Sequence, residues 1–160
     1  MSIAVDYFFN HSDGLAAITE LMNKSIGCSL SPYQGQPDDM FSRFLGMELT
    51  LSKCEFENDR DLDFENYALH LSLRTPMGLA QLRGMQLPAM AYIAYALCFG
   101  FEVAGMLVYD GQSLLARYEQ RHHNEPGENS LYDTVSNEFV EFPKHLDTLR
   151  RRLPEGSGLG

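Results

Sequence analysis

The sequence is poor in cysteine and lacks any pattern that would pair its thiols. Its three cysteines, Cys28, Cys54 and Cys98, are an odd number without a CxxC or cysteine–histidine spacing. Cys98 lies in an apolar run and is expected to be a small buried hydrophobe. The cysteines therefore predict a reducing, cytoplasmic compartment, with no metal and no cofactor bound through thiolates.

The residues at the start of the sequence do not predict a leader peptide. The first residues, MSIAVDYFFNHSDG, lack the basic and long apolar regions of a signal peptide. The longest nearly apolar run, Leu87 to Phe101, has 15 residues, which is short for a membrane span and typical of a core helix. We therefore expect no membrane association.

Basic residues are scarce relative to acidic ones. Lysine and arginine total 12 against 22 aspartates and glutamates, giving a net charge of −10. Such a surface repels nucleic-acid phosphates and anionic lipids, which disfavours direct binding to either. It favours a basic protein partner, because opposite fields speed encounter. The plainer alternative is that the acidity only keeps the protein soluble.

Motifs for catalysis are missing as well. The chain has no GxSxG, no glycine-rich phosphate loop and no HExxH. Adjacent His122 and His123 with Glu125 read more simply as a polar loop tip, because neighbours on a strand point to opposite faces. A small enzyme or ligand-binding domain with histidine chemistry stays open as an alternative, with the candidates His11, His70, His122 and His123.

What is present predicts one folded domain. The 160 residues, of which 44% are hydrophobic, suffice for a single core over 1–153, followed by a disordered or vector-derived tail at 154–160. The fold class is α+β: a mostly antiparallel sheet with about three helices packed on it. One of these helices is expected to be central and buried near 88–100, with Pro88 in its first turn.

Periodicity places the other elements. Residues 3–9 are β-branched and aromatic, as in a strand, and apolar side chains at helical spacing follow from 12 or 13 to 26. Residues 31–39 contain two prolines and a glycine and are expected to form a loop. A final helix should begin at Pro143.

Two hairpins are predicted. Apolar and polar residues alternate through Met47–Leu51 and through Tyr67–Leu73, which flank the acidic stretch CEFENDRDLDFEN. Asp110-Gly111 between apolar runs is a strong turn signal, although residues 112–120 also have helical spacing. Residues 131–142 should form one or two short strands, with a turn near 136–137.

The acidic stretch is not a calcium loop. Asp59, Asp61 and Asp63 match the first ligand positions of an EF-hand. Phe64 then stands where the loop needs glycine, and His70 stands where it needs glutamate. We therefore predict no metal site in this segment.

The same stretch is the densest negative charge in the chain. If it were extended, alternate carboxylates would lie roughly 6.6–6.8 Å apart on one side, like a row of phosphates. Exposed aromatics among them would supply the anchors of a protein interface. A hairpin tip whose charges discourage edge pairing is the alternative. The predicted partner-binding residues are Glu55, Glu57, Asp59, Asp61, Asp63 and Glu65, with Asp38 and Asp39 as secondary contacts.

The closing run LYDTVSNEFVEFPKHLDTLRRRL, with the small, acidic α+β character, resembles bacterial immunity proteins of polymorphic-toxin and contact-dependent-inhibition systems. The resemblance implies a stoichiometric inhibitor that occludes the active site of a cognate toxin, often a basic nuclease. Acidic side chains would then take the place of substrate phosphates. It implies no specific site residues.

The leading interpretation is a non-enzymatic acidic binding protein that acts as such an immunity protein. A nucleic-acid mimic that inhibits a defence nuclease would share the same electrostatics and differ only in its partner. The histidine-based alternative would need those side chains to converge in a polar pocket.

Overall fold

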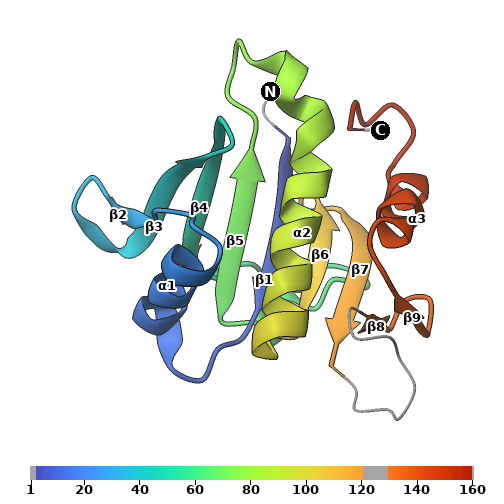
Figure 1. The fold of residues 1–160 in the computed structure, drawn as a ribbon, viewed down its shortest axis with the longest axis horizontal. Coiled ribbons are helices and arrows are strands. Elements are labelled where there is room, and N and C mark those ends of the chain that lie inside the picture. Colours follow the sequence, from blue (N-terminus) through green and yellow to red (C-terminus); the bar gives the residue numbers. More distant parts are fainter. Residues whose placement is uncertain (1–2, 121–129, 160) are drawn as a thin grey trace.

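The computed structural model describes residues 3–120 and 130–159. This part of the chain forms a nine-stranded, wholly antiparallel sheet with three α-helices, which confirms the predicted α+β class (Figure 1). The spatial order of the strands is β2-β3-β4-β5-β1-β6-β7-β8-β9. Their bounds are β1 Ala4–Phe9, β2 Ser31–Tyr33, β3 Gln36–Phe44, β4 Met47–Lys53, β5 Leu69–Arg74, β6 Gly105–Tyr109, β7 Ser113–Glu119, β8 Leu131–Asp133 and β9 Glu138–Val140.

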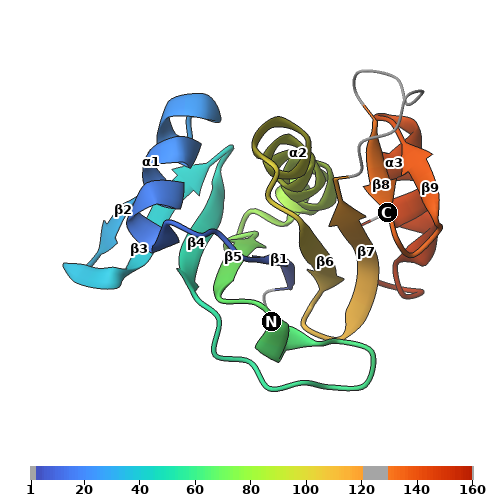
Figure 2. The same cartoon turned by 90° about the horizontal axis from the view of Figure 1, so that it is seen from below.

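The helices are α1 (Gly14–Ser25), α2 (Arg83–Phe101) and α3 (Lys144–Arg152), with short 3-10 turns at Phe64–Asn66 and Ala80–Leu82. Figure 2 shows the three α-helices on one side of the sheet and the long β4–β5 connection, residues 54–68, on the other. The sheet therefore has a helical face and a loop-covered face.

Strand β1 is buried along its whole length because both of these faces are covered. Val5, Tyr7 and Phe9 belong to the large core under the helices. Phe8 belongs to a second, smaller cluster under the loop. The alternation of a strand thus places neighbouring residues in two different cores.

The two predicted hairpins are present as strand pairs. β4 and β5 are antiparallel, and β6 and β7 are joined at Asp110 and Gly111, whose φ values of 49° and 67° are those of a tight primed turn. The turn selects the strand interpretation for residues 113–119 over the helical one. The short strands β8 and β9 also form, around a turn that contains Asn137 with φ of 56°.

The loop predicted for residues 31–39 is wrong. This segment forms β2, a tight turn and the first part of β3. Gln34 and Gly35 have φ of 49° and 76°, which again suits a primed hairpin turn. Pro32 is tolerated because β2 is the outermost strand of the sheet and needs fewer ladder hydrogen bonds.

Helix α2 is the predicted central helix, but it begins at Arg83, five residues before the expected start at Pro88. Gln86 holds this extra turn. Its amide nitrogen donates to the carbonyls of Ile3 (2.6 Å) and Leu73 (2.8 Å), and its oxygen accepts from the Thr75 hydroxyl (2.7 Å). The buried amide fastens the helix to the ends of β1 and β5.

The helical segment Ala80–Phe101 has 22 residues and contains an 18-residue window with a mean hydropathy of 1.3, so by length and composition it could cross a membrane. Half of its most apolar window is buried inside the fold, and core helices of folded domains meet the same requirement. The helix is longer than the 15-residue apolar run Leu87 to Phe101 on which the expectation of no membrane association was based, and that expectation stays a prediction.

The chain beyond α3 differs from the disordered tail expected at 154–160. Leu159 is buried against the main core, and the Tyr109 hydroxyl donates a hydrogen bond to the Ser157 carbonyl (3.2 Å). Residues 154–159 thus fold back onto the domain.

Candidate partner-binding surface

The acidic segment is a long loop that crosses the face of the sheet opposite the helices. It is not extended, so its alternate carboxylates do not form the single row that an extended segment would give. Leu62 and Phe64 are buried in the small cluster with Phe8, Met106 and Val108 of the central strands. Each such side chain stabilises by about 1.5–3 kcal/mol when buried, so the loop has a hydrophobic anchor of its own.

Arg117 on β7 clamps the middle of the loop. Its guanidinium contacts the Asp63 carboxylate at 2.7 Å, donates to the Asp61 carbonyl at 2.7 Å and reaches the Tyr67 hydroxyl at 3.3 Å. Partial burial raises the pKa of Asp63, but hydrogen bonds from Asn66 and Arg117 outweigh it and hold that pKa below its usual range. Asp63 and Arg117 therefore form a structural ion pair within the fold.

Hydrogen bonds within the loop set its outer shape. Asn58 and Glu65 form two reciprocal hydrogen bonds. The backbone amide of Asn58 donates to the Glu65 carboxylate (3.1 Å), and the backbone amide of Glu65 donates to the side-chain oxygen of Asn58 (2.8 Å). Asp59 and Leu62 exchange backbone hydrogen bonds of 3.0 and 2.8 Å across a turn. Arg60 in that turn has φ of 55°. The tip is thus a defined turn.

Most of the predicted partner residues are exposed on this loop. Asp63 is the exception, because Arg117 already pairs with it. We call the exposed set the acidic loop surface: Glu55, Glu57, Asp59, Asp61 and Glu65. The cation nearest in the chain, Arg60, lies 3.6 Å from Asp59, and both side chains are largely exposed.

Asp38 and Asp39, the secondary candidates, are exposed on β3. Asp39 is in register with Ser52, and Asp38 pairs with Lys53 at 3.7 Å, at the end of β4 where the loop departs. These two residues therefore border the start of the loop and lie apart from its tip.

Phe56 is the aromatic side chain that the loop leaves exposed between two of its carboxylates. The residue is 41% exposed and lies between Glu55 and Glu57 in the chain. Its ring contacts Phe8 at 5.4 Å and Phe64 at 5.1 Å, so its inner edge rests on the small cluster. This arrangement fixes the ring while keeping part of it in solvent.

An acid–histidine pair lies beneath the loop, and sequence reasoning missed it. Asp6 on β1 contacts His70 on β5 at 3.0 Å, and both side chains are largely buried. His70 stacks on Phe8 at 4.5 Å and meets the edge of Phe56 at 5.0 Å. The available signal was a lone aspartate inside the apolar strand IAVDYFF.

The histidines of the alternative hypothesis do not form a cluster among the described residues. His70 pairs with Asp6, whereas His11 lies in the turn before α1, where its carbonyl accepts from the Gly14 backbone amide. His122 and His123 lie outside the described residues. Within residues 3–120 and 130–159, no group of three histidine, cysteine or acidic side chains is placed to hold a metal ion.

A polar pocket of about 370 Å³ opens beside the loop. It contains the clamp residue Arg117 and Tyr67, together with the carboxylates Glu102 and Glu119. None of the histidines described above lines it. The pocket therefore extends the charged region around the loop and gives no separate support to histidine chemistry.

Comparison with known proteins leaves the surface itself as the basis for assigning a function. No family model, no curated protein and no solved structure matches the chain. The charge, anchoring and exposure of the acidic loop surface are therefore the features that bear on its function.

Proposed function

We propose that the protein is a non-enzymatic binding protein, an immunity protein that neutralises a basic bacterial toxin by covering its active site. The observation that carries the proposal is a set of five exposed acidic residues on one loop that is anchored to the sheet. A disordered acidic segment would need to lose conformational entropy on binding. This loop has already lost much of it on folding.

The electrostatics support a basic protein partner. The acidic loop surface carries five of the 22 acids and is interrupted by one arginine, in a molecule of charge −10. Concentrated charge of one sign steers an oppositely charged partner and raises its association rate. A toxin that binds nucleic acid would present a complementary basic site to these carboxylates.

Phe56 supplies the apolar component that such an interface needs. Hot spots of protein interfaces are enriched in aromatic side chains surrounded by polar contacts. Phe56 has carboxylates on both sides in the chain and is supported from below by Phe8 and Phe64. Its exposed edge can insert into a partner while the charges around it pair at the rim.

The test is a double charge reversal, Asp59→Lys with Asp61→Lys. Both side chains are exposed, and the anchoring hydrogen bonds at these residues involve backbone atoms, so the loop should keep its shape. Once affinity capture has identified the partner, we expect association by surface plasmon resonance to slow by at least about tenfold at low salt. The effect should shrink as salt screens the charges.

The matched control is Glu138→Lys with Glu155→Lys, which changes the net charge equally at two exposed sites outside the loop. It should slow association far less. If the two double variants slowed association equally, the effect would come from net charge and not from the loop. An unchanged association rate in the loop variant would refute the proposed site. Inhibition of the captured partner's activity at one-to-one stoichiometry would distinguish an immunity protein from a simple adaptor.

A further inference from the structure

The outward side of helix α2 carries an apolar stripe that no described helix or strand covers in Figures 1 and 2. Its members are at least partly exposed, and Tyr92 is 63% exposed. No charged residue occurs between Gly84 and Phe101. The stripe consists of Met85, Pro88, Tyr92, Ala96 and Phe99.

The spacing of this stripe is symmetric about Tyr92. Met85 and Phe99 are each seven residues from it, and Pro88 and Ala96 are each four residues from it. At 100° per residue these positions share one narrow face of the helix. An antiparallel copy related by a twofold axis at Tyr92 would therefore oppose Met85 with Phe99, and Pro88 with Ala96.

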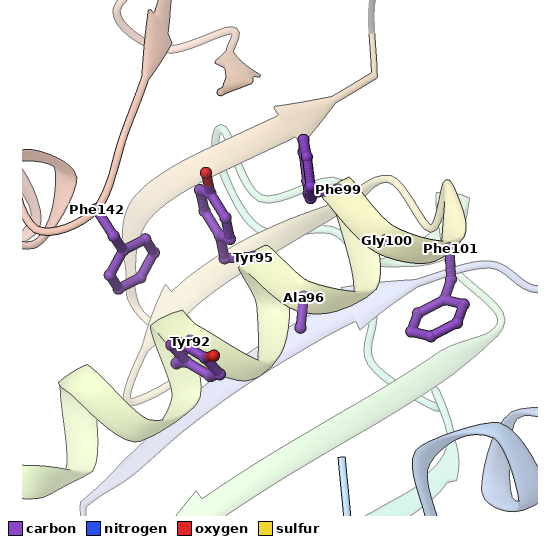
Figure 3. Close-up of a pocket in the computed structure, with 7 residues that line it drawn as sticks. All are labelled: Tyr92, Tyr95, Ala96, Phe99, Gly100, Phe101 and Phe142. Carbon is purple, nitrogen blue, oxygen red and sulfur yellow. The ribbon is translucent and has the colours of Figure 1, made fainter. Parts of the chain in front are cut away.

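The two halves of the stripe also differ in shape in a complementary way. A groove of about 450 Å³ lies over the C-terminal half, where Ala96 and Gly100 leave space between aromatic rings (Figure 3). Phe142, from the segment before α3, forms one wall through ring contacts with Tyr92 and Tyr95. The N-terminal half presents Met85, a flexible side chain suited to filling an irregular gap.

We propose that a second copy of this chain occupies the groove, forming a twofold dimer in which two α2 helices pack antiparallel. Met85 of each copy enters the groove over Ala96 and Gly100 of the other, and the two Tyr92 rings meet at the axis. The absence of charge along α2 matters here, because two molecules of net charge −10 repel each other over most of their surface.

The dimer is expected to be weak. The exposed parts of Tyr92, Phe99 and Phe101 amount to roughly 270 Å², taking about 200 Å² for a whole aromatic side chain. A stable interface buries about 800 Å² on each partner, so these rings supply about a third. We therefore expect dissociation in the micromolar range or above. The acidic loop surface lies on the opposite face of the sheet and would stay accessible.

The test uses residue 92, which faces its own copy across the axis. Analytical ultracentrifugation from about 1 to about 200 µM should show a monomer–dimer equilibrium for the unaltered protein. Tyr92→Glu and Tyr92→Lys should each be monomeric, because like charges meet at the axis. An equimolar mixture of these two variants should dimerise again through the opposite charges.

Met77→Glu is the control, since Met77 is 92% exposed, apolar and outside α2; it should leave dimerisation unchanged. Circular dichroism establishes that each variant is folded. A monomer at every concentration, or a dimer that survives in Tyr92→Glu, would overturn the proposal. So would binding to zwitterionic vesicles by a wild type that does not self-associate. The acidic-loop double variant should dimerise normally, so this test is independent of the proposed function.

Discussion

At the scale of single residues, the structure places one histidine where protonation is costly. His145 on α3 is buried and hydrogen-bonded to the Tyr118 hydroxyl. Burial lowers the pKa of His145 from 6.5 to about 4; the nearby Asp133 carboxylate opposes this shift and Arg152 adds to it. The neutral imidazole is therefore the form that the fold accepts.

This predicts a specific pH dependence of stability. Between pH 6.5 and about 4, the unfolded chain binds a proton at His145 and the folded chain does not. As the pH is lowered through that window, the free energy of unfolding should therefore decrease by about 1.4 kcal/mol for each pH unit. Above pH 6.5 neither state binds this proton, and the full stability is present.

The measurement is urea unfolding of the wild type and of His145→Gln, which cannot titrate, at about pH 7.5 and about pH 5. The free-energy difference between the two proteins should shift by about 2 kcal/mol in favour of the variant at the lower pH. All other titrating groups are common to both proteins and cancel. Parallel pH profiles would contradict a depressed pKa at His145.

At the scale of elements, the N-terminal turn of α2 depends on one buried amide. Gln86 satisfies three partners: the carbonyl of Ile3 just before β1, the carbonyl of Leu73 on β5, and the hydroxyl of Thr75 just after β5. Replacing it with an apolar side chain would leave these groups without their partner in a buried site. An unsatisfied buried group costs about 1–3 kcal/mol.

We therefore expect Gln86→Leu to lower the free energy of unfolding by about 3 kcal/mol. Gln81→Leu is the matched control: Gln81 lies on the exposed 3-10 turn just before α2, and its replacement should cost less than about 0.5 kcal/mol. The comparison is made by denaturant unfolding. Equal stability of the two variants would show that Gln86 does not hold the helix.

At the scale of the whole molecule, the excess of acids acts on stability as well as on partners. The net charge of −10 is concentrated partly on the acidic loop surface, where one arginine offsets five acids. Like charges repel in the compact state more than in the expanded chain. Binding a basic partner would relieve this repulsion, which connects the stability of the loop with its proposed function.

Screening should therefore stabilise the protein. Raising sodium chloride from about 20 mM to about 500 mM should increase the free energy of unfolding by on the order of 1 kcal/mol. The variant Asp59→Asn with Asp61→Asn has less repulsion to screen and should gain less. Thermal and urea unfolding at both salt concentrations measure this, and a wild type destabilised by salt would argue against net self-repulsion.

The sequence by itself determined the features that depend on near neighbours. Strand alternation predicted the pairing of β4 with β5, and Asp110-Gly111 predicted the β6–β7 turn. These signals are local, because side-chain period and turn geometry depend on a few consecutive residues. The count of acids and bases likewise follows from the sequence alone.

Only the tertiary structure decided the conformation of the acidic segment and the start of α2. Leu62 and Phe64 are buried by Phe8 and Met106, which lie far away in the chain, and this burial folds the acidic segment into a loop although its carboxylates alternate as in a strand. Gln86 stabilises the added N-terminal turn of α2 through partners on β5 and just before β1. Contacts between residues distant in sequence leave no periodic local signal. One such contact, with Arg117, distinguishes Asp63 from the exposed acids around it.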